Sequence, residues 1–299
     1  MKKLLVNIII LAIVFLAGGC AKQNNSKDVV FVSILPQKYF VERITGDDFD
    51  LQVMVVPGAE PATYEPTTRQ VVKLGEAEVF FTIGVPFEKS FIPKVKQQLK
   101  ELKFVATDQG IEKLHSPTFD DIFKDSSHEG NHEEHHHEGA DPHIWLAPNL
   151  VIKQSRTITD YFVKNYPDRA DYYEKNYSAF KEELAVISKS SRARFKEIPN
   201  NEFLCFHPSW GYFAQEFELT QIPIELEGKE PTPQEQQAII KYVKQKNIKV
   251  IFVQKQFNRR IADSIAEQIG GVVVSLDPLA EDYLQNIEEI TSIMLENMK

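Results

Sequence analysis

The sequence predicts an α/β protein of two similar lobes, each with a central parallel sheet flanked by helices, joined by one long helix. Short β-branched runs alternate with helical patterns near both ends of the chain, which is typical of parallel strands with crossover helices. Between the two halves, residues 168–196 contain no glycine or proline. The chain is also long enough for two domains of ordinary size.

The N-terminal residues predict export. Two lysines precede an apolar stretch at residues 4–16, and small residues stand directly before Cys20. This is the layout of a secretory signal, and the stretch is short for a membrane span. Because a cysteine after small residues resembles a bacterial lipobox, we expect residues 1–19 to be a signal peptide, Cys20 to be lipidated and residues 20–27 to form a tether. An ordinary secretory signal is the alternative.

Residues 28–147 are expected to form the N-terminal lobe. Pro36 is placed to open a helix directly after the first apolar run, and Pro57-Gly58 ends the second. The expected strands of this lobe are residues 29–34, 51–56, 78–83 and 104–106.

Residues 148–198 are expected to be helical. Pro148 is placed to start one helix, and Pro167 to be the first residue of a longer one. The longer helix carries a narrow apolar stripe with steps of three and four residues, made up of Tyr173, Tyr177, Phe180, Leu184, Ile187 and Ser191. A helix with such a stripe and charged other faces is suited to lie across both lobes.

Residues 199–299 repeat the rhythm of the first lobe. Thr232 and Glu235 form a capping-box pattern at the start of a helix, and Gly270-Gly271 ends another. The expected strands are residues 203–206, 221–226, 250–253 and 272–274, and the expected helices are residues 210–216, 233–246, 259–269 and 281–298.

The net charge of −9 argues against a nucleic-acid partner and suits cations as ligands. We also expect a monomer. The two cysteines are Cys20 and Cys205, so a lipidated Cys20 leaves no internal disulfide. Cys205 lies in an apolar run and is interpreted as a packed core thiol; the alternative is a soft metal ligand beside His207.

A histidine-rich tract is the strongest functional signal. Six of the eight histidines lie in residues 128–143, mixed with acids, and such composition indicates metal binding. Within the loop at residues 126–140 we expect a low-affinity metal site made of His128, His132, His135, His136 and His137. The alternatives are a solvated charge run and a purification tag, and the internal, irregular position of the tract argues against the latter.

Four further residues are candidate metal ligands because of where they follow expected strands. Ligands of parallel α/β sheets bind beyond the carboxyl ends of the strands. His207 and Asp277 directly follow strands, Glu60 follows the strand ending near Val56, and His143 precedes the helical segment. Two imidazoles with one or two carboxylates suit zinc or another divalent transition metal. Alternatively, Glu60 is a solvated loop acid and Asp277 a turn residue.

The order of short motifs resembles a known family. The motifs are Pro-Gly at 57–58, Tyr-Glu-Pro at 64–66, Asp-Pro-His-Ile-Trp-Leu at 141–146, Phe-His-Pro-Ser-Trp-Gly-Tyr-Phe at 206–213, Gly-Lys-Glu-Pro-Thr-Pro at 228–233 and Leu-Asp-Pro-Leu at 276–279. Over nearly the whole mature chain this is similar to the zinc- and manganese-type substrate-binding proteins of bacterial ABC importers, the ZnuA-like branch. The resemblance implies two α/β lobes bridged by a rigid helix, with metal held between them.

The resemblance carries over at His143, His207 and Asp277. The family's first ligand histidine is replaced here by Ala62, and alanine cannot ligate. Since zinc is normally four-coordinate, the missing position would be filled by Glu60, by water, by an imidazole of the loop, or not at all. His207, where manganese-type members carry glutamate, favours Zn²⁺ over Mn²⁺.

The predicted function is capture of Zn²⁺ outside the cytoplasm and delivery to the permease of an ABC importer. The protein would be held by the Cys20 lipid in the periplasm or at the cell surface, and no enzymatic activity is expected. Two alternatives stay open. The first is a lipid-anchored metal buffer or sensor that uses the histidine-rich loop, and the second is a zinc-dependent hydrolase, since three protein ligands with one open position are the arrangement of catalytic zinc.

Overall fold

The structure is a computed structural model, and it describes residues 27–115, 122, 139–225, 228–257 and 259–298. The predicted signal peptide, Cys20 and the five loop histidines from His128 to His137 lie outside these ranges. Among the helices of the described part, none is both long and apolar enough to cross a membrane.

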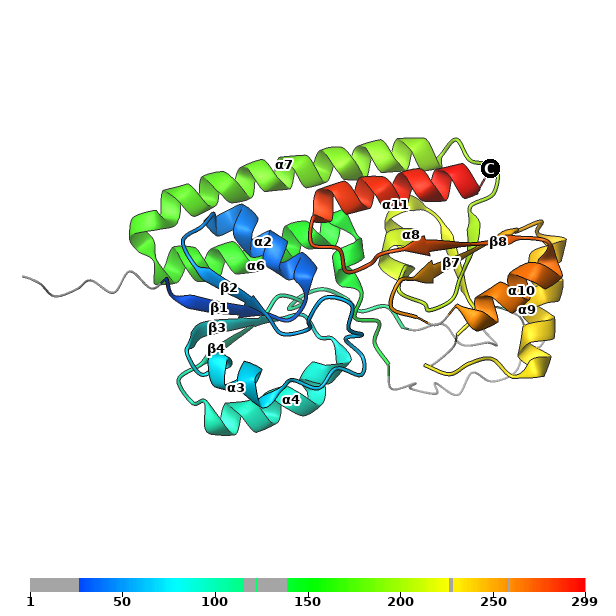
Figure 1. Cartoon of the computed structure of the whole chain (residues 1–299). Coiled ribbons are helices and arrows are strands. Elements are labelled where there is room, and N and C mark those ends of the chain that lie inside the picture. The colour runs from blue at the N-terminus through cyan, green and yellow to red at the C-terminus, as the bar shows by residue number, and fades with distance from the viewer. Residues whose placement is uncertain (1–26, 116–121, 123–138, 226–227, 258, 299) are drawn as a thin grey trace, which may run out of the picture.

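The N-terminal lobe is built on a four-stranded parallel sheet in the order β2-β1-β3-β4 (Figure 1). Its strands are β1 (Val29–Val32), β2 (Asp50–Val53), β3 (Ala77–Thr82) and β4 (Lys103–Ala106), and its helices are α2 (Leu35–Thr45), α3 (Thr68–Leu74) and α4 (Pro86–Gln98). Strand β1 is buried on both faces, as expected of a central parallel strand covered by helices.

The C-terminal lobe repeats this plan with a parallel sheet in the order β6-β5-β7-β8. Its strands are β5 (Glu202–Cys205), β6 (Thr220–Pro223), β7 (Val250–Gln254) and β8 (Val272–Leu276), and its helices are α8 (Gly211–Phe217), α9 (Pro233–Gln245), α10 (Arg260–Ile269) and α11 (Tyr283–Asn297). The predicted capping box of α9 is confirmed, because Thr232 Oγ1 accepts from Glu235 N and Glu235 reaches back to Thr232 N.

Helices α6 (Pro148–Asn165) and α7 (Ala170–Phe195) connect the lobes. Helix α7 runs the length of the molecule and packs on α2 of one lobe and on α8 and α11 of the other (Figure 1). The long helix was expected to start at Pro167. In the structure, Pro167–Arg169 forms a separate 3-10 turn, η2, and α7 begins after it at Ala170. The apolar stripe is confirmed at five of its six residues, which are buried, whereas Ile187 is only partly buried.

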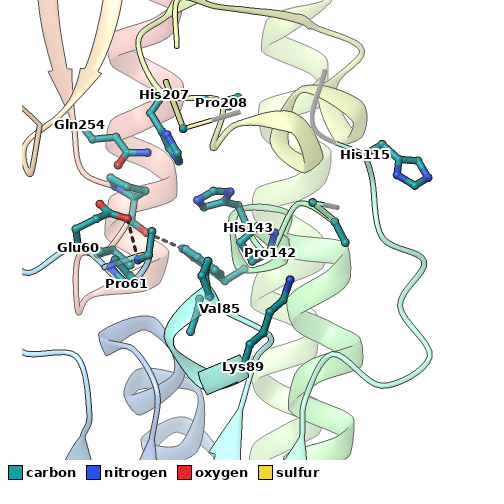
Figure 2. A pocket seen from close by; sticks show the side chains of 18 of the residues that line it. Glu60, Pro61, Val85, Lys89, His115, Pro142, His143, His207, Pro208 and Gln254 are labelled. Atoms are coloured by element: carbon teal, nitrogen blue, oxygen red, sulfur yellow. Dashed lines mark hydrogen bonds between the residues drawn. The ribbon is translucent and has the colours of Figure 1, made fainter. Parts of the chain in front are cut away.

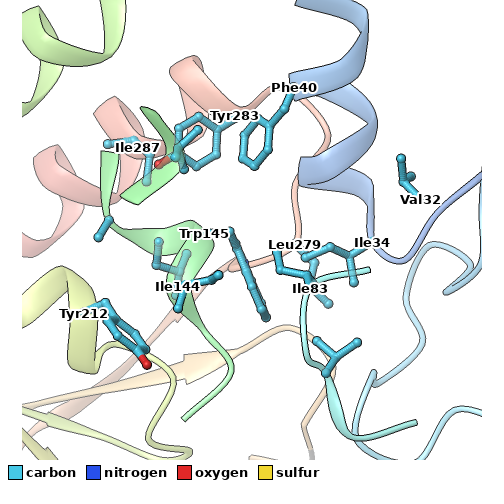
Figure 3. Packing of buried hydrophobic residues seen from close by; sticks show 14 of the residues in the cluster. Val32, Ile34, Phe40, Ile83, Ile144, Trp145, Tyr212, Leu279, Tyr283 and Ile287 are labelled. Carbon is cyan, nitrogen blue, oxygen red and sulfur yellow. The ribbon is translucent and has the colours of Figure 1, made fainter. Parts of the chain in front are cut away.

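One apolar core extends through both lobes. Phe40 of α2 meets Tyr283 of α11 edge to face, with ring centroids 5.0 Å apart, and Trp145 lies between the lobes (Figure 3). Trp145 Nε1 donates to the carbonyl of Pro278 at 2.7 Å. Lys38 and Glu281 add an ion pair between α2 and the loop before α11. The two lobes are therefore held in a fixed relation by packing as well as by α7.

Candidate metal centre

A cavity of about 520 Å³ lies between the lobes, at the carboxyl ends of the two sheets (Figure 2). This is the position that parallel α/β sheets favour for a ligand. The polar side chains of the lining include His143, His207, Glu60 and Lys89, and its apolar walls include Val85, Pro86, Pro142, Trp145 and Leu279.

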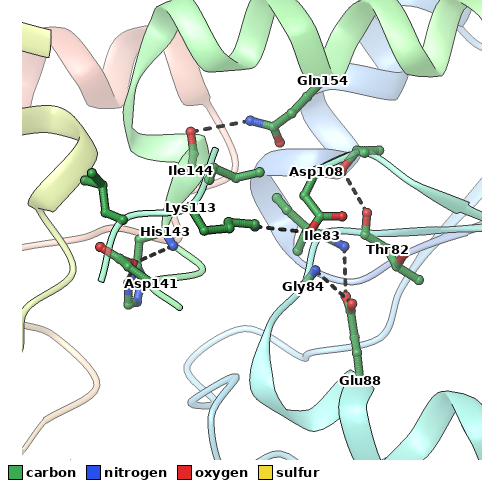
Figure 4. A network of polar contacts seen from close by, with 12 residues as sticks. Thr82, Ile83, Gly84, Glu88, Asp108, Lys113, Asp141, His143, Ile144 and Gln154 are labelled. Carbon is green, nitrogen blue, oxygen red and sulfur yellow. Dashed lines mark hydrogen bonds and ion pairs between the residues drawn. The ribbon is translucent and has the colours of Figure 1, made fainter. Parts of the chain in front are cut away.

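His143 is held by the carboxylate two residues before it. Its Nδ1 lies 2.7 Å from Asp141 Oδ1, which also accepts from the His143 backbone N–H at 2.9 Å (Figure 4). Asp141 is almost fully buried. Since a carboxylate accepts the Nδ1 proton, the Nε2 lone pair of His143 is left available for a metal.

His207 is oriented in the same way from the other lobe. It follows β5, and its Nδ1 lies 3.2 Å from Oε1 of the buried Glu225. Its ring also stacks on Phe257, with centroids 4.9 Å apart. The ring centroids of His143 and His207 are 5.4 Å apart, so the structure brings together two imidazoles that the chain places in different lobes.

Glu60 joins the two histidines at the cavity (Figure 2). Its Oε1 accepts from Ala62 N at 3.3 Å, while its Oε2 is buried and has no hydrogen-bond partner among the described residues. A buried carboxylate oxygen without a partner is costly unless it receives a proton or a cation. Glu60 Oε2 is therefore a candidate acceptor for a proton or a cation.

Asp277, the fourth candidate ligand, does not line the cavity of the two histidines. It lines a neighbouring cavity of about 210 Å³. Its carboxylate is engaged by Lys255 Nζ at 3.4 Å, Gln256 Nε2 at 3.4 Å and Leu279 N at 3.0 Å. Within the described ranges, no three His, Cys, Asp or Glu side chains already lie close enough together to hold a metal ion.

Among the titratable residues of the lining, His115 and Lys89 were not singled out from the sequence. His115 pairs through its backbone with Ala140, and both residues line the cavity. His115 stands ahead of the histidine-rich tract in the sequence, and this position is the signal that would have pointed to it. Lys89, on α4, has no such signal, because only the fold brings α4 to the cavity.

The remaining sequence candidates are accounted for. Ala62 lines the cavity, so the family's first ligand position faces the centre but offers no donor atom. Cys205 is fully buried in the apolar core, as predicted, and burial raises the pKa of its thiol well above the ordinary value.

Comparison with known proteins gives a consistent result. The family model ZnuA, described as zinc-uptake complex component A, periplasmic, matches residues 30–297. The high-affinity zinc uptake system protein ZnuA of Bacillus subtilis (strain 168) is 28% identical over 296 residues, which cover 94% of this chain and 88% of that protein. The zinc-binding lipoprotein AdcA of Streptococcus pneumoniae is 27% identical over 305 residues, and the chain spans 60% of its length.

Solved structures show the same likeness. A zinc-bound deletion variant of ZnuA has a TM-score of 0.82 and 36% identity, covering 92% of this chain and 99% of that one. The laminin-binding protein Lmb of Streptococcus agalactiae has a TM-score of 0.77 at 23% identity, with 92% of this chain covered and 100% of that one. The second likeness shows a shared fold alone.

Proposed function

The chain belongs to the ZnuA family, and we propose that it captures Zn²⁺ outside the cytoplasm and delivers it to the permease of an ABC importer. The observation that carries this proposal is the pair of imidazoles at one inter-lobe cavity, each with its Nδ1 engaged by a buried carboxylate. That arrangement fixes the ring orientation and raises the basicity of the free nitrogen, as in many zinc sites.

We propose Glu60, His143 and His207 as the protein ligands of the zinc. One carboxylate and two imidazoles are a suitable donor set for zinc, and the borderline nitrogen donors favour it over Mn²⁺. Glu60 takes the ligand role because its Oε2 is unpartnered and Ala62 has no donor. Direct ligation by Asp277, which Lys255 engages, would require that contact to be released.

The export and recruitment steps belong to the same proposal. A lipid at Cys20 would keep the protein near its permease, and the histidines at 128–137 would gather zinc at low affinity. His115 and Ala140 line the cavity and stand on either side of that segment in the sequence. The described flanks of the segment therefore border the cavity that contains His143.

The test is zinc titration calorimetry on the chain from Ser26, with and without residues 126–140. We expect one tight site to survive the deletion and to be lost in His207→Ala. Glu60→Gln is expected to weaken this site by at least about tenfold, because a neutral amide oxygen is a poorer zinc ligand than a carboxylate. Glu65→Gln, an exposed acid of the same loop, is the matched control.

Ala62 supports a second candidate function, a metal buffer in which the histidine-rich segment does the binding. In that case, deletion of residues 126–140 would remove most zinc binding, and His207→Ala would have little effect. The same titrations therefore separate the two functions.

A further inference from the structure

Resting on the proposed function, we propose that the cavity takes zinc as a ternary complex with a free amino acid. The nitrogen of the amino acid would fill the coordination position that Ala62 leaves open, and its carboxylate would pair with Lys89. The substrate class would then be a zinc–amino-acid complex rather than the bare ion.

The first argument is the incomplete donor set. Glu60, His143 and His207 supply three ligands, whereas zinc in proteins prefers four. Ala62 faces the same cavity with a methyl group only. A small molecule with a nitrogen donor would replace the missing imidazole with the same kind of donor atom, whereas a water ligand would supply an oxygen donor instead.

The second argument is the size of the cavity. A single water ligand needs on the order of 30 Å³, whereas the cavity measures about 520 Å³. Its volume lies in the range of about 300–1,000 Å³ that is usual for small-molecule sites. Val85, Pro142 and Leu279 line it with apolar surface, against which the carbon skeleton of an amino acid can pack.

The third argument is the charge of Lys89. This exposed lysine lines the cavity, and its side chain extends toward Pro142 and His143 (Figure 2). Across the described part of the chain, no hydrogen bond or ion pair engages it. Lys229 also lines the cavity but takes part in another interaction. Lys89 therefore offers a cationic partner to an anionic group bound in the cavity.

A bound amino acid supplies that anionic group through its carboxylate. The carboxylate can then accept a charge-assisted hydrogen bond from Lys89. On coordination the amino group gives up its ammonium proton to solvent, since only the neutral amine has a lone pair for the metal.

The test is equilibrium dialysis of radiolabelled L-histidine against the full chain, with and without one equivalent of zinc. We expect one equivalent of L-histidine to be retained with zinc and none without it. Lys89→Gln should weaken retention about tenfold, as for loss of a hydrogen bond to a charged group. Lys94→Gln, an exposed lysine on the same helix, should have no effect. L-histidine methyl ester, which lacks the carboxylate, should bind wild type and Lys89→Gln alike.

Ala62→His provides the decisive comparison. The added imidazole would fill the open position, so this variant should keep zinc and no longer retain L-histidine. Retention that is equal in Ala62→His and wild type, or zinc binding without any L-histidine, would overturn the ternary complex and leave the proposed function standing. Failure of the wild-type cleft to bind zinc at all, read from metal content, would overturn both.

Discussion

The imidazoles of His143 and His207 face each other across the lobe boundary with ring centroids 5.4 Å apart and ring planes inclined by 76°. Each ring is fixed by its own carboxylate, Asp141 or Glu225. Most of the cost of ordering these ligands is therefore met during folding, before any metal arrives.

Removing one of these supporting charges should weaken zinc binding without removing a ligand. In Glu225→Gln the neutral amide no longer raises the basicity of His207, and we expect a loss of zinc affinity of about 10–100-fold. Titration calorimetry measures the affinity, and circular dichroism checks that the fold is kept. An unchanged affinity in a folded variant would show that Glu225 does not act through His207.

Zinc affinity should fall in acid. Protonated imidazole cannot ligate, so protons compete with zinc for the two histidine nitrogens as the pH falls. We therefore expect weaker zinc binding at pH 5 than at pH 7.5. Titration at pH 7.5 and pH 5 measures this, and equal affinities would contradict histidine ligation.

Glu88 should make the folded state less stable as the pH rises. Burial raises its pKa to about 7 from an ordinary 4.5. This rise is opposed by a hydrogen bond from Ser33 Oγ and by two from Ile83 N and Gly84 N (Figure 4). Below pH 4.5 the group is protonated in both states and has no effect. Between pH 4.5 and 7 the unfolded state ionises first, so stability is lost, by up to about 3 kcal/mol above pH 7.

Glu88→Gln isolates this effect, because glutamine does not titrate. Urea unfolding at pH 5 and pH 8 should show the free energy of unfolding of wild type falling relative to that of the variant. Glu101→Gln, at an exposed position, is the control. A constant difference between wild type and Glu88→Gln at both pH values would mean that Glu88 is ionised throughout.

Trp145→Phe should destabilise the junction of the lobes. The change leaves the buried carbonyl of Pro278 without the indole N–H and opens space in the shared core. We expect the free energy of unfolding to fall by about 2–4 kcal/mol, measured by urea denaturation. Tyr172→Phe, at a more exposed aromatic ring on α7, should change it little, and a similar loss in both variants would argue against a special role for Trp145.

Local signals predicted the elements of the fold well. Thr232 and Glu235 start α9, and Gly270 in the left-handed conformation ends α10, because capping depends on neighbouring residues only. The start of α7 was placed three residues early. Pro167 fits the first turn of a helix, and the structure resolves that turn as the separate 3-10 helix η2.

The candidate site was predicted in part. His143 and His207 follow from strand ends and motif order, and both line the cavity. The engagement of Asp277 by Lys255 depends on a side chain from a different strand end. Lys89 was not predicted to line the cavity, because the neighbouring sequence does not indicate which surface a single lysine on an amphipathic helix will face.

The sequence by itself determined the α/β class, the two-lobe plan, the helix caps and the histidines that can bind a metal, since these depend on periodicity and on neighbouring residues. Only the tertiary structure decided which donors share a cavity. The packing of α2, α7 and α11 sets the relation of the lobes. This relation leaves Glu60 Oε2 without a hydrogen-bond partner among the described residues, in the cavity that both imidazoles line, while the carboxylate of Asp277 pairs with Lys255. The distances between these side chains depend on many contacts between parts of the chain that are far apart in sequence, so no local sequence pattern predicts them.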